Sequence, residues 1–111
     1  MATGAAASIL VIEDRMVSNL VCAVLRKQGY VVTAVDAAAA MARIQSPGSR
    51  VELLITNSPG PFLDFSDQIP MLYLTSSPDP DLQSAFRACR VVRKPFAPAE
   101  LVDAVRELMR T

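Results

Sequence analysis

Short apolar runs alternate with amphipathic segments along most of the chain. Each run is a few residues long, rich in β-forming side chains and closed by polar or turn-forming residues, which is typical of strands buried on both faces. The expected strands are Ser8–Ile12, Val31–Ala34, a third that begins at Val51 and ends near Asn57, residues 71–74 and residues 91–93. Strands that alternate with helices predict an α/β domain with a parallel sheet and right-handed crossovers.

The first two segments between the strands have the spacing of helices that cover a sheet. After Ser8–Ile12, apolar residues recur three and four positions apart, at Val17, Leu20, Val21, Val24 and Leu25. Gly29 follows them, in the place where a left-handed helix end is expected. Asp36 is placed to cap a second helix over Ala37–Gln45.

Two further helices are expected later in the chain. A helix over residues 79–89 would turn four side chains inward, those of Leu82, Ala85, Phe86 and Cys89. The last helix begins near Pro98, with Glu100 in its first turn. Its apolar face consists of Leu101, Val102, Val105, Leu108 and Met109.

The residues between the third and fourth strands break this pattern. A Pro-Gly-Pro sequence at 59–61 leaves only residues 62–68 for a helix, whereas a parallel crossover needs about a dozen residues. We therefore expect a loop or a single turn here. Phe62, Leu63 and Phe65 would then fold onto the sheet in the place of a helix.

Polar side chains follow the strands at the points where the strands end. Glu13 and Asp14 follow the first strand, Asn57 the third, Thr75 the fourth and Lys94 the fifth. In a five-stranded sheet of order 2-1-3-4-5 these ends lie together, at the edge where open α/β sheets bind ligands. The sequence therefore predicts one polar cluster of two carboxylates, an amide, a hydroxyl and an ammonium group.

Composition removes several classes of chemistry. The 111 residues indicate one domain, and the absence of histidine excludes Ser-His-Asp triads, Cys-His dyads and most zinc sites. Eleven basic and eleven acidic residues cancel, so charge predicts no general affinity for nucleic acid. Cys22 and Cys89 lie far apart without a CxxC spacing, and we expect them to be reduced thiols used in packing.

The charges are unevenly distributed along the chain. Residues 51–85 contain acidic but no basic side chains, whereas basic side chains predominate in residues 86–111. One part of the surface should therefore be acidic and another basic. The beginning of the chain has neither the basic region of a signal peptide nor a long apolar run. We expect a cytoplasmic protein with flexible residues 1–7, a folded domain over 8–111 and no membrane association.

Five stretches of the sequence resemble a response-regulator receiver domain of the chemotaxis-regulator type. They are VIED at 11–14, GYVVTAVDA at 29–37, LLITN at 53–57, PMLYLTSS at 70–77 and KPFAPAEL at 94–101. The Lys-Pro-Phe turn with its following Glu-Leu is the most specific of them, and the resemblance covers essentially the whole chain. It implies a flavodoxin-like, doubly wound sheet of five parallel strands in the order 2-1-3-4-5, here with the third helix shortened or missing.

The resemblance also implies roles for the polar cluster. In that family an acid pair holds Mg²⁺, an aspartate after the third strand accepts a phosphoryl group, and a Thr or Ser and a Lys contact that group. Glu13 and Asp14 match the acid pair, and Thr75 and Lys94 match the two phosphoryl contacts. Pro95 matches the proline after the lysine, whose peptide bond is usually cis in the family.

Asn57 stands where the family has its phosphoaccepting aspartate. A carboxylate oxygen attacks phosphorus to form an acyl phosphate, whereas an amide oxygen is an uncharged and poor nucleophile. Mg²⁺ also loses an anionic ligand, so we expect either no cofactor or weakly bound Mg²⁺ at Glu13 and Asp14. Lys94 loses its nearest carboxylate, and we expect it to turn toward Asp14 or Glu13. The alternative phosphoacceptors are Ser58, Asp64 and Asp67.

The favoured interpretation is a degenerate receiver, or pseudo-receiver, of a two-component phosphorelay system. It would be neither phosphorylated nor an enzyme, and it would act through protein–protein interaction. The expected partners are a histidine kinase, another response regulator or an output domain, without nucleic acid. A homodimer through the face made by helix 79–89, strand 91–93 and the last helix is a further expectation. The apolar area left by the missing helix is a second docking candidate if Phe62 and Phe65 do not cover it.

The alternative function is that of a flavodoxin-like binder of a nucleotide or flavin phosphate. Such a site needs backbone donors in a glycine- or serine-rich loop after the first strand. Here that loop is Glu-Asp-Arg-Met at 13–16, and its carboxylates repel phosphate unless a metal intervenes. A small hydrolase is a third reading, which lacks a candidate nucleophile with a base as its partner.

Overall fold

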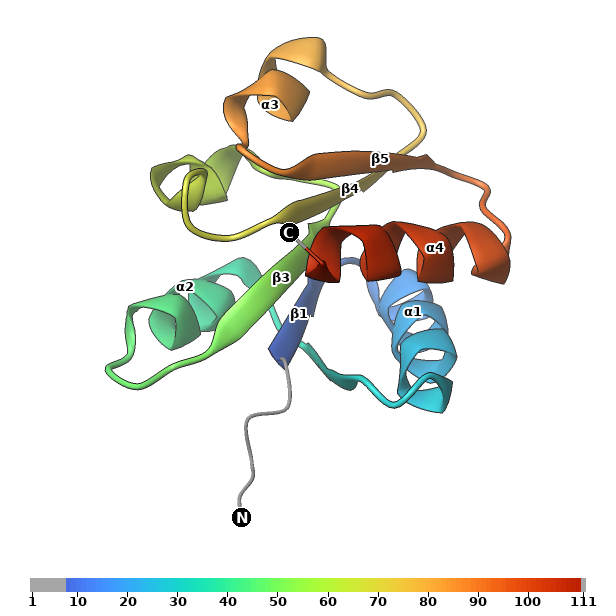
Figure 1. Cartoon of the computed structure of the whole chain (residues 1–111), viewed down its shortest axis with the longest axis horizontal. Coiled ribbons are helices and arrows are strands. Elements are labelled where there is room, and N and C mark those ends of the chain that lie inside the picture. The colour runs from blue at the N-terminus through green and yellow to red at the C-terminus, as the bar shows by residue number, and fades with distance from the viewer. Residues whose placement is uncertain (1–7, 111) are drawn as a thin grey trace.

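Five parallel strands form one sheet in the computed structural model, which describes residues 8–110 (Figure 1). The strand order β2-β1-β3-β4-β5 confirms the fold predicted from the sequence. The strands are β1 (Ser8–Ile12), β2 (Val31–Ala34), β3 (Val51–Thr56), β4 (Met71–Thr75) and β5 (Cys89–Arg93). The expected flexibility of residues 1–7 concerns a segment outside the described residues. No helix within residues 8–110 is both long enough and apolar enough to cross a membrane.

Helices cover both faces of this sheet. Helices α1 (Arg15–Lys27) and α4 (Pro98–Met109) pack on one face, and α2 (Ala37–Gln45) and the short 3₁₀ helix η1 (Gly60–Phe65) pack on the other (Figure 1). Side chains alternate between the two faces along each strand, so Leu53 and Ile55 face α1 and α4 while Leu54 faces α2. This double burial explains why the strands read as continuous apolar runs.

Helix α1 buries a stripe that is rotated from the one the sequence predicted. Its buried residues are Ser18, Val21, Cys22 and Leu25, with Val17 and Val24 half-buried. Leu20 is 48% exposed, so its predicted place on the buried face is wrong. Successive helical residues are about 100° apart, and the stripe is centred between Val21 and Cys22, which places Leu20 roughly 150° from this centre, on the exposed side of the helix.

Three of the predicted helix ends are confirmed. Gly29 has a φ of 91°, the left-handed conformation that glycine adopts without a Cβ clash. The Asp36 carboxylate accepts a hydrogen bond of 2.7 Å from the Ala39 backbone N–H and so caps α2. At the start of α4, the Glu100 carboxylate accepts a bond of 2.9 Å from the Ala97 N–H.

The link between β3 and β4 holds only the 3₁₀ helix η1, as its length predicted. Residues three apart lie on the same side of a 3₁₀ helix. Phe62 and Phe65 therefore face the sheet together, and Phe62 is fully buried while Phe65 is half-buried. Leu63 points away and is 41% exposed, so its predicted packing is wrong. Because the two phenylalanines cover the sheet here, the docking patch considered for a bare face is not formed.

The helix expected over residues 79–89 is shorter in the structure. Helix α3 spans only Pro80–Ala85, Ala85 is exposed, and Phe86 already has an extended backbone although its side chain is buried. Cys89 is the first residue of β5, where it pairs with Met71, so its predicted place inside a helix is wrong. The pairing of β5 with β4 begins two residues earlier than the apolar pattern indicated and ends the helix.

Candidate functional site

The register of the sheet places the first members of the polar cluster side by side. Ile12 on β1 pairs with Thr56 on β3, so Glu13 and Asn57 are the next residues on two neighbouring strands. Both strands are parallel, and both residues therefore lie at the carboxyl edge of the sheet. This is the arrangement predicted for the acid pair and the position after the third strand.

The same edge contains the other two members of the cluster. Thr75 closes β4 and pairs with Arg93 at the end of β5, and Lys94 follows directly. The Lys94 backbone N–H donates a hydrogen bond of 3.0 Å to the Thr75 carbonyl oxygen, which fixes where the lysine side chain leaves the sheet. The Lys94–Pro95 peptide bond is cis, as the resemblance implied.

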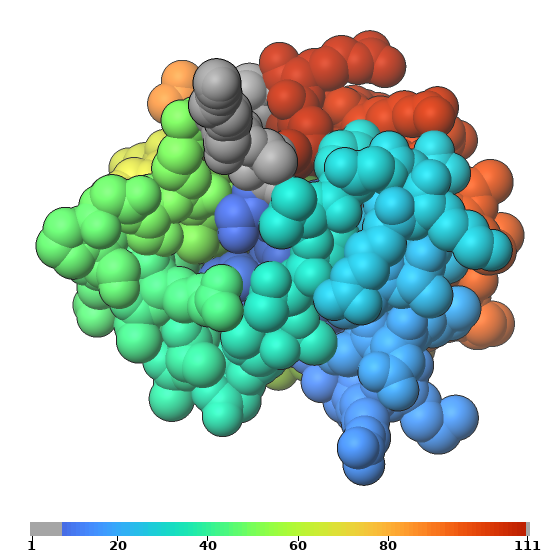
Figure 2. Space-filling model, turned by 90° about the horizontal axis from the view of Figure 1, so that it is seen from below, coloured from blue at the N-terminus to red at the C-terminus, as the bar shows by residue number. Residues whose placement is uncertain are grey.

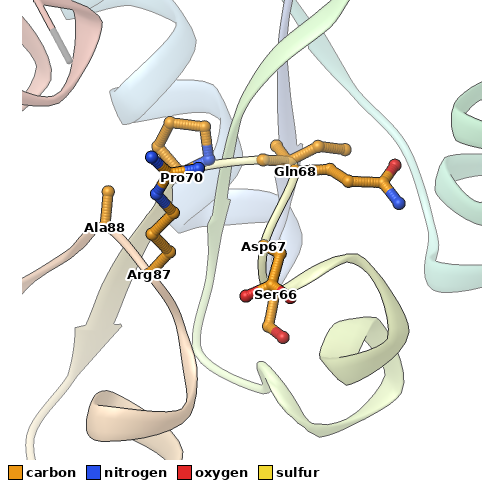
Figure 3. A pocket seen from close by; sticks show the side chains of 7 residues that line it. Ser66, Asp67, Gln68, Pro70, Arg87 and Ala88 are labelled. Atoms are coloured by element: carbon orange, nitrogen blue, oxygen red, sulfur yellow. The ribbon is translucent and has the colours of Figure 1, made fainter.

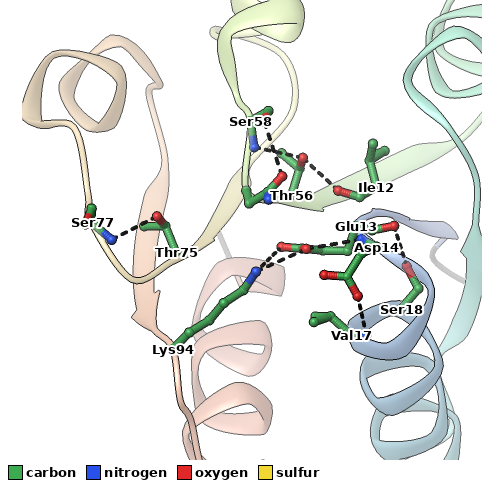
Figure 4. A network of polar contacts seen from close by, with 11 residues as sticks. Ile12, Glu13, Asp14, Val17, Ser18, Thr56, Ser58, Thr75, Ser77 and Lys94 are labelled. Carbon is green, nitrogen blue, oxygen red and sulfur yellow. Dashed lines mark hydrogen bonds and ion pairs between the residues drawn. The ribbon is translucent and has the colours of Figure 1, made fainter.

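Lys94 points at Glu13 (Figure 4). Its Nζ atom donates a hydrogen bond of 3.1 Å to Oε1 of Glu13 and lies 3.1 Å from Oε2. The side chain of Glu13 is fully buried, and that of Lys94 is 25% exposed. Sequence reasoning expected Lys94 to turn toward Asp14 or Glu13, and the structure selects Glu13.

The Glu13 carboxylate has few other partners. Oε1 also accepts a bond of 3.3 Å from the Asp14 backbone N–H. Within residues 8–110, Oε2 is a buried oxygen without a hydrogen bond of its own, although it is in ion-pair contact with Nζ. A buried carboxylate is costly unless a cation and hydrogen bonds compensate its charge, so the charge of Glu13 depends mainly on Lys94.

Asp14 serves the neighbouring helix. One of its carboxylate oxygens, Oδ1, accepts a bond of 3.0 Å from the Val17 N–H, which caps the N-terminus of α1. The Ser18 hydroxyl donates a bond of 3.1 Å to the Glu13 carbonyl oxygen and fixes the same loop. The two acidic residues named from the sequence therefore have different surroundings, one paired with a lysine and the other at a helix cap.

Thr56 is a structural member of the site that sequence reasoning missed. It is fully buried, and its hydroxyl donates a bond of 2.9 Å to the Ile12 carbonyl oxygen and accepts one of 3.1 Å from the Ser58 N–H. These bonds join the ends of β1 and β3. The signal in the sequence was a single threonine at the end of an otherwise apolar buried strand.

The amide of Asn57 and the hydroxyl of Thr75 make only local bonds. The Asn57 Oδ1 atom accepts a bond of 3.2 Å from the Ser58 hydroxyl, and the Thr75 hydroxyl oxygen accepts one of 3.1 Å from the Ser77 N–H. Asn57 is exposed. The structure thus gathers Glu13 and Lys94 into direct contact and leaves the other members of the cluster beside them.

The arrangement does not fit a resident Mg²⁺ ion. Mg²⁺ requires oxygen ligands in near-octahedral geometry, usually including carboxylates. Glu13 is neutralised by an ammonium group, Asp14 caps a helix, and Asn57 offers an uncharged oxygen already bonded to Ser58. Within residues 8–110, no three Asp, Glu, Cys or His side chains gather as a metal would require.

Two hollows lie at the opposite, amino-terminal edge of the sheet. One of about 360 Å³ sits before β4 and β5 and is lined by Ser66, Asp67, Gln68, Ile69, Pro70, Arg87 and Ala88 (Figure 3). Asp67, one of the alternative phosphoacceptors, is therefore separated from the polar cluster. The other hollow lies beside Ser8, which begins β1, and is lined mainly by residues 43–51; Figure 2 views this end and shows the recessed start of β1 in blue.

The two cysteines are free thiols, as expected. Burial raises the pKa of the Cys22 thiol, an effect that the nearby Arg26 partly opposes. Burial also raises the pKa of the Cys89 thiol, to about 11. Both groups are therefore protonated near neutral pH, which suits packing rather than nucleophilic chemistry.

No protein-family model matches the chain, and no curated protein matches it. Several solved structures do match it. The chain is 23% identical to the chemotaxis response regulator CheY4 of Vibrio cholerae, with a TM-score of 0.75 over 93% of this chain and 98% of that one. It is 21% identical to a response regulator receiver protein from Sinorhizobium medicae, with a TM-score of 0.78 over 96% and 97% of the two chains.

A third similar structure extends the likeness to a more distant sequence. A response regulator from Thermotoga maritima is 16% identical, with a TM-score of 0.78 over 96% of this chain and 99% of that one. The chain therefore has the fold of response-regulator receiver domains along nearly its whole length. At these identities the likeness concerns the fold, and function must be argued from the site.

Proposed function

We propose that this chain is a receiver-like signalling module of a two-component system that is not switched by aspartyl phosphate. The observation that carries the proposal is Asn57, which follows β3 at the carboxyl edge of a receiver fold, beside Glu13. Phosphoryl transfer to this position needs a carboxylate nucleophile, and an amide does not supply one. The module is a binding protein rather than an enzyme.

The surroundings of Asn57 support this proposal. The Asn57 oxygen accepts a hydrogen bond from Ser58, and Lys94 is paired with Glu13 instead of with residue 57. The lysine that would contact a phosphoryl group is therefore already engaged by a buried carboxylate. In the part of the chain that the structure describes, the Ser58 hydroxyl has no general base as its hydrogen-bond partner, which disfavours it as a substitute acceptor.

Protein–protein contact is the remaining way for such a module to act. The proposed partners are a histidine kinase, another response regulator or an output domain. The surface formed by α3, β5 and α4 is the candidate interface, including for a homodimer. An ion pair between Arg90 on β5 and Glu107 on α4 joins two elements of this surface. The elements of this surface are already packed together in the free chain, so the surface forms without phosphorylation.

The loop between β1 and α1 argues against a flavin or nucleotide phosphate. A phosphate would have to reach the backbone N–H groups at the start of α1. The Asp14 carboxylate already accepts a bond from the Val17 N–H there, and Glu13 lies next to it. Two carboxylates at this helix end repel a phosphate group, which disfavours this alternative.

Nuclear magnetic resonance with a phosphoryl mimic tests the proposal. Addition of Mg²⁺ and beryllofluoride should leave the amide signals of Thr75 and Lys94 unchanged, because the mimic needs a carboxylate at residue 57. Asn57→Asp is the matched control, since it differs from the native chain only in the group at issue. A clear two-state shift at Thr75 and Lys94 in the native chain would refute the proposal.

A further inference from the structure

The ion pair between Lys94 and Glu13 lies where a receiver site would hold its metal. Glu13 follows β1 and Lys94 follows β5, and in the sheet order β3 and β4 lie between these two strands. The lysine side chain therefore reaches across the carboxyl ends of two strands to meet its partner (Figure 4). We propose that the Lys94 ammonium is the resident cation of this site, holding Glu13 in place of a divalent metal and excluding Mg²⁺.

The burial of Glu13 is the first argument. Its side chain is fully buried, and both carboxylate oxygens lie 3.1 Å from the Lys94 Nζ atom. Among the described residues, Oε2 has no hydrogen-bond donor besides this contact. A buried carboxylate requires a compensating cation, and this chain supplies that cation from its own sequence.

A divalent ion would also have to compete with Lys94 for Glu13. A divalent ion that bound Glu13 would have to displace the ammonium group or sit next to it, and like charges at that separation repel strongly. Lys94 is tethered to the sheet edge by the bond between its backbone N–H and the Thr75 carbonyl oxygen. A tethered group competes at a high effective concentration, whereas free Mg²⁺ must be supplied from solution.

The other candidate metal ligands at this edge are too weak to replace Glu13. Asp14 Oδ1 is engaged by the Val17 N–H, and the Asn57 oxygen is uncharged. Neither compensates for the loss of Glu13 as a ligand. The consequence is a carboxyl edge in which the loops after β1 and β5 stay joined whatever the metal concentration. This rests on the proposed function, since it takes the site to be a former phosphorylation site.

The test is a Mg²⁺ titration in which the amide signals of Glu13 and Asp14 are monitored. Lys94→Met keeps most of the side chain and removes the charge, and it should bind Mg²⁺ about tenfold or more tightly than the native chain. Lys94→Arg, which keeps a cation, should bind as weakly as the native chain. Arg93→Met is the matched control, because it removes one positive charge from an exposed neighbouring residue that does not pair with Glu13. It should change the affinity by no more than about twofold.

Two results would overturn the inference. One is a Lys94→Met protein that binds Mg²⁺ no better than Arg93→Met; the other is a native chain that binds Mg²⁺ with loss of the Lys94 contact. A measurement on the native chain covers the case in which Lys94→Met does not fold. The Lys94 ¹⁵Nζ signal should be unchanged by millimolar Mg²⁺, and a change would contradict the proposal.

The proposed function and this inference fail in different experiments. A native chain that binds Mg²⁺ through Glu13 yet does not respond to beryllofluoride overturns the inference and supports the function. A native chain that responds to the phosphoryl mimic, while Mg²⁺ alone leaves its Lys94 ¹⁵Nζ signal unchanged and Lys94→Met gains metal affinity over Arg93→Met, overturns the function and supports the inference.

Discussion

Lys94 and Glu13, 81 positions apart in the sequence, are joined by an ion pair that spans the carboxyl ends of β3 and β4. The glutamate side chain is fully buried and the lysine side chain is three-quarters buried. The pair thus joins the first and last strands of the chain at the edge of the sheet where its polar residues gather. The stability of this edge therefore depends on it.

Removal of the lysine charge should destabilise the fold. Lys94→Met leaves the buried Glu13 carboxylate without its cation, and we expect a loss of about 2–3 kcal/mol in the free energy of unfolding. Glu13→Gln should cost less, about 1 kcal/mol, because Lys94 can reach solvent. The double variant should lose clearly less than the sum of the two, a coupling of about 1–2 kcal/mol. Urea unfolding of the four proteins measures this, and strict additivity would show that the pair contributes nothing.

Asn57→Asp should redirect Lys94. A carboxylate at residue 57 offers the lysine a second partner and adds an anionic ligand, so Glu13 becomes available to a metal. We expect Mg²⁺ affinity to rise by about tenfold or more. We also expect the variant to become phosphorylated by a small phosphodonor. A Mg²⁺ titration and intact-mass measurement test this; an unchanged affinity would mean that the site is altered beyond its missing carboxylate.

Phe62 should stabilise the fold by covering a part of the sheet that a helix covers elsewhere. It belongs to the 3₁₀ helix, and its side chain is fully buried against the sheet. Phe62→Ala should cost about 3–4 kcal/mol through lost burial and the cavity left behind. Leu63→Ala, next to it but exposed, should cost under about 1 kcal/mol. Equal effects in thermal or urea unfolding would contradict the structural role given to Phe62.

Cys89 should resist modification near neutral pH, and ionisation of its thiol should lower the stability of the fold at high pH. Burial raises the pKa of its thiol from 9.0 to about 11, so little thiolate forms in the folded state near neutral pH. Alkylation by iodoacetamide at pH 8 should therefore be much slower in the folded than in the unfolded chain. The stability that depends on the neutral thiol is fully present below pH 9 and is lost as pH rises toward 11. Cys89→Ala should remove this loss of stability. If the stability of Cys89→Ala depends on pH in the same way as that of the native chain, the prediction is wrong.

The sequence predicted the fold well where hydrophobic periodicity was strong. All five strands, their order and the caps at Gly29 and Asp36 are as expected. The errors lie where tertiary packing decides. Leu20 and Leu63 are apolar side chains that the helix geometry turns outward. Cys89 was assigned to a helix because the pairing of β5 with β4, a long-range interaction, is invisible to a local pattern.

The candidate site was predictable in its membership but not in its contacts. Strand ends and the resemblance to receiver domains pointed to Glu13, Asp14, Asn57, Thr75 and Lys94. Which carboxylate Lys94 selects depends on burial and on the tether to Thr75, neither of which a sequence reveals. Thr56 was missed for a similar reason, because its hydroxyl matters only once β1 and β3 are adjacent.

Intact-mass spectrometry of the native chain after incubation with Mg²⁺ and a small phosphodonor shows whether a site with Asn57 in place of an aspartate accepts a phosphoryl group. We expect no added phosphoryl group, under conditions in which Asn57→Asp acquires one. A phosphoryl adduct on the native chain, mapped to residue 57 or to a neighbour at the carboxyl edge such as Ser58, would contradict it.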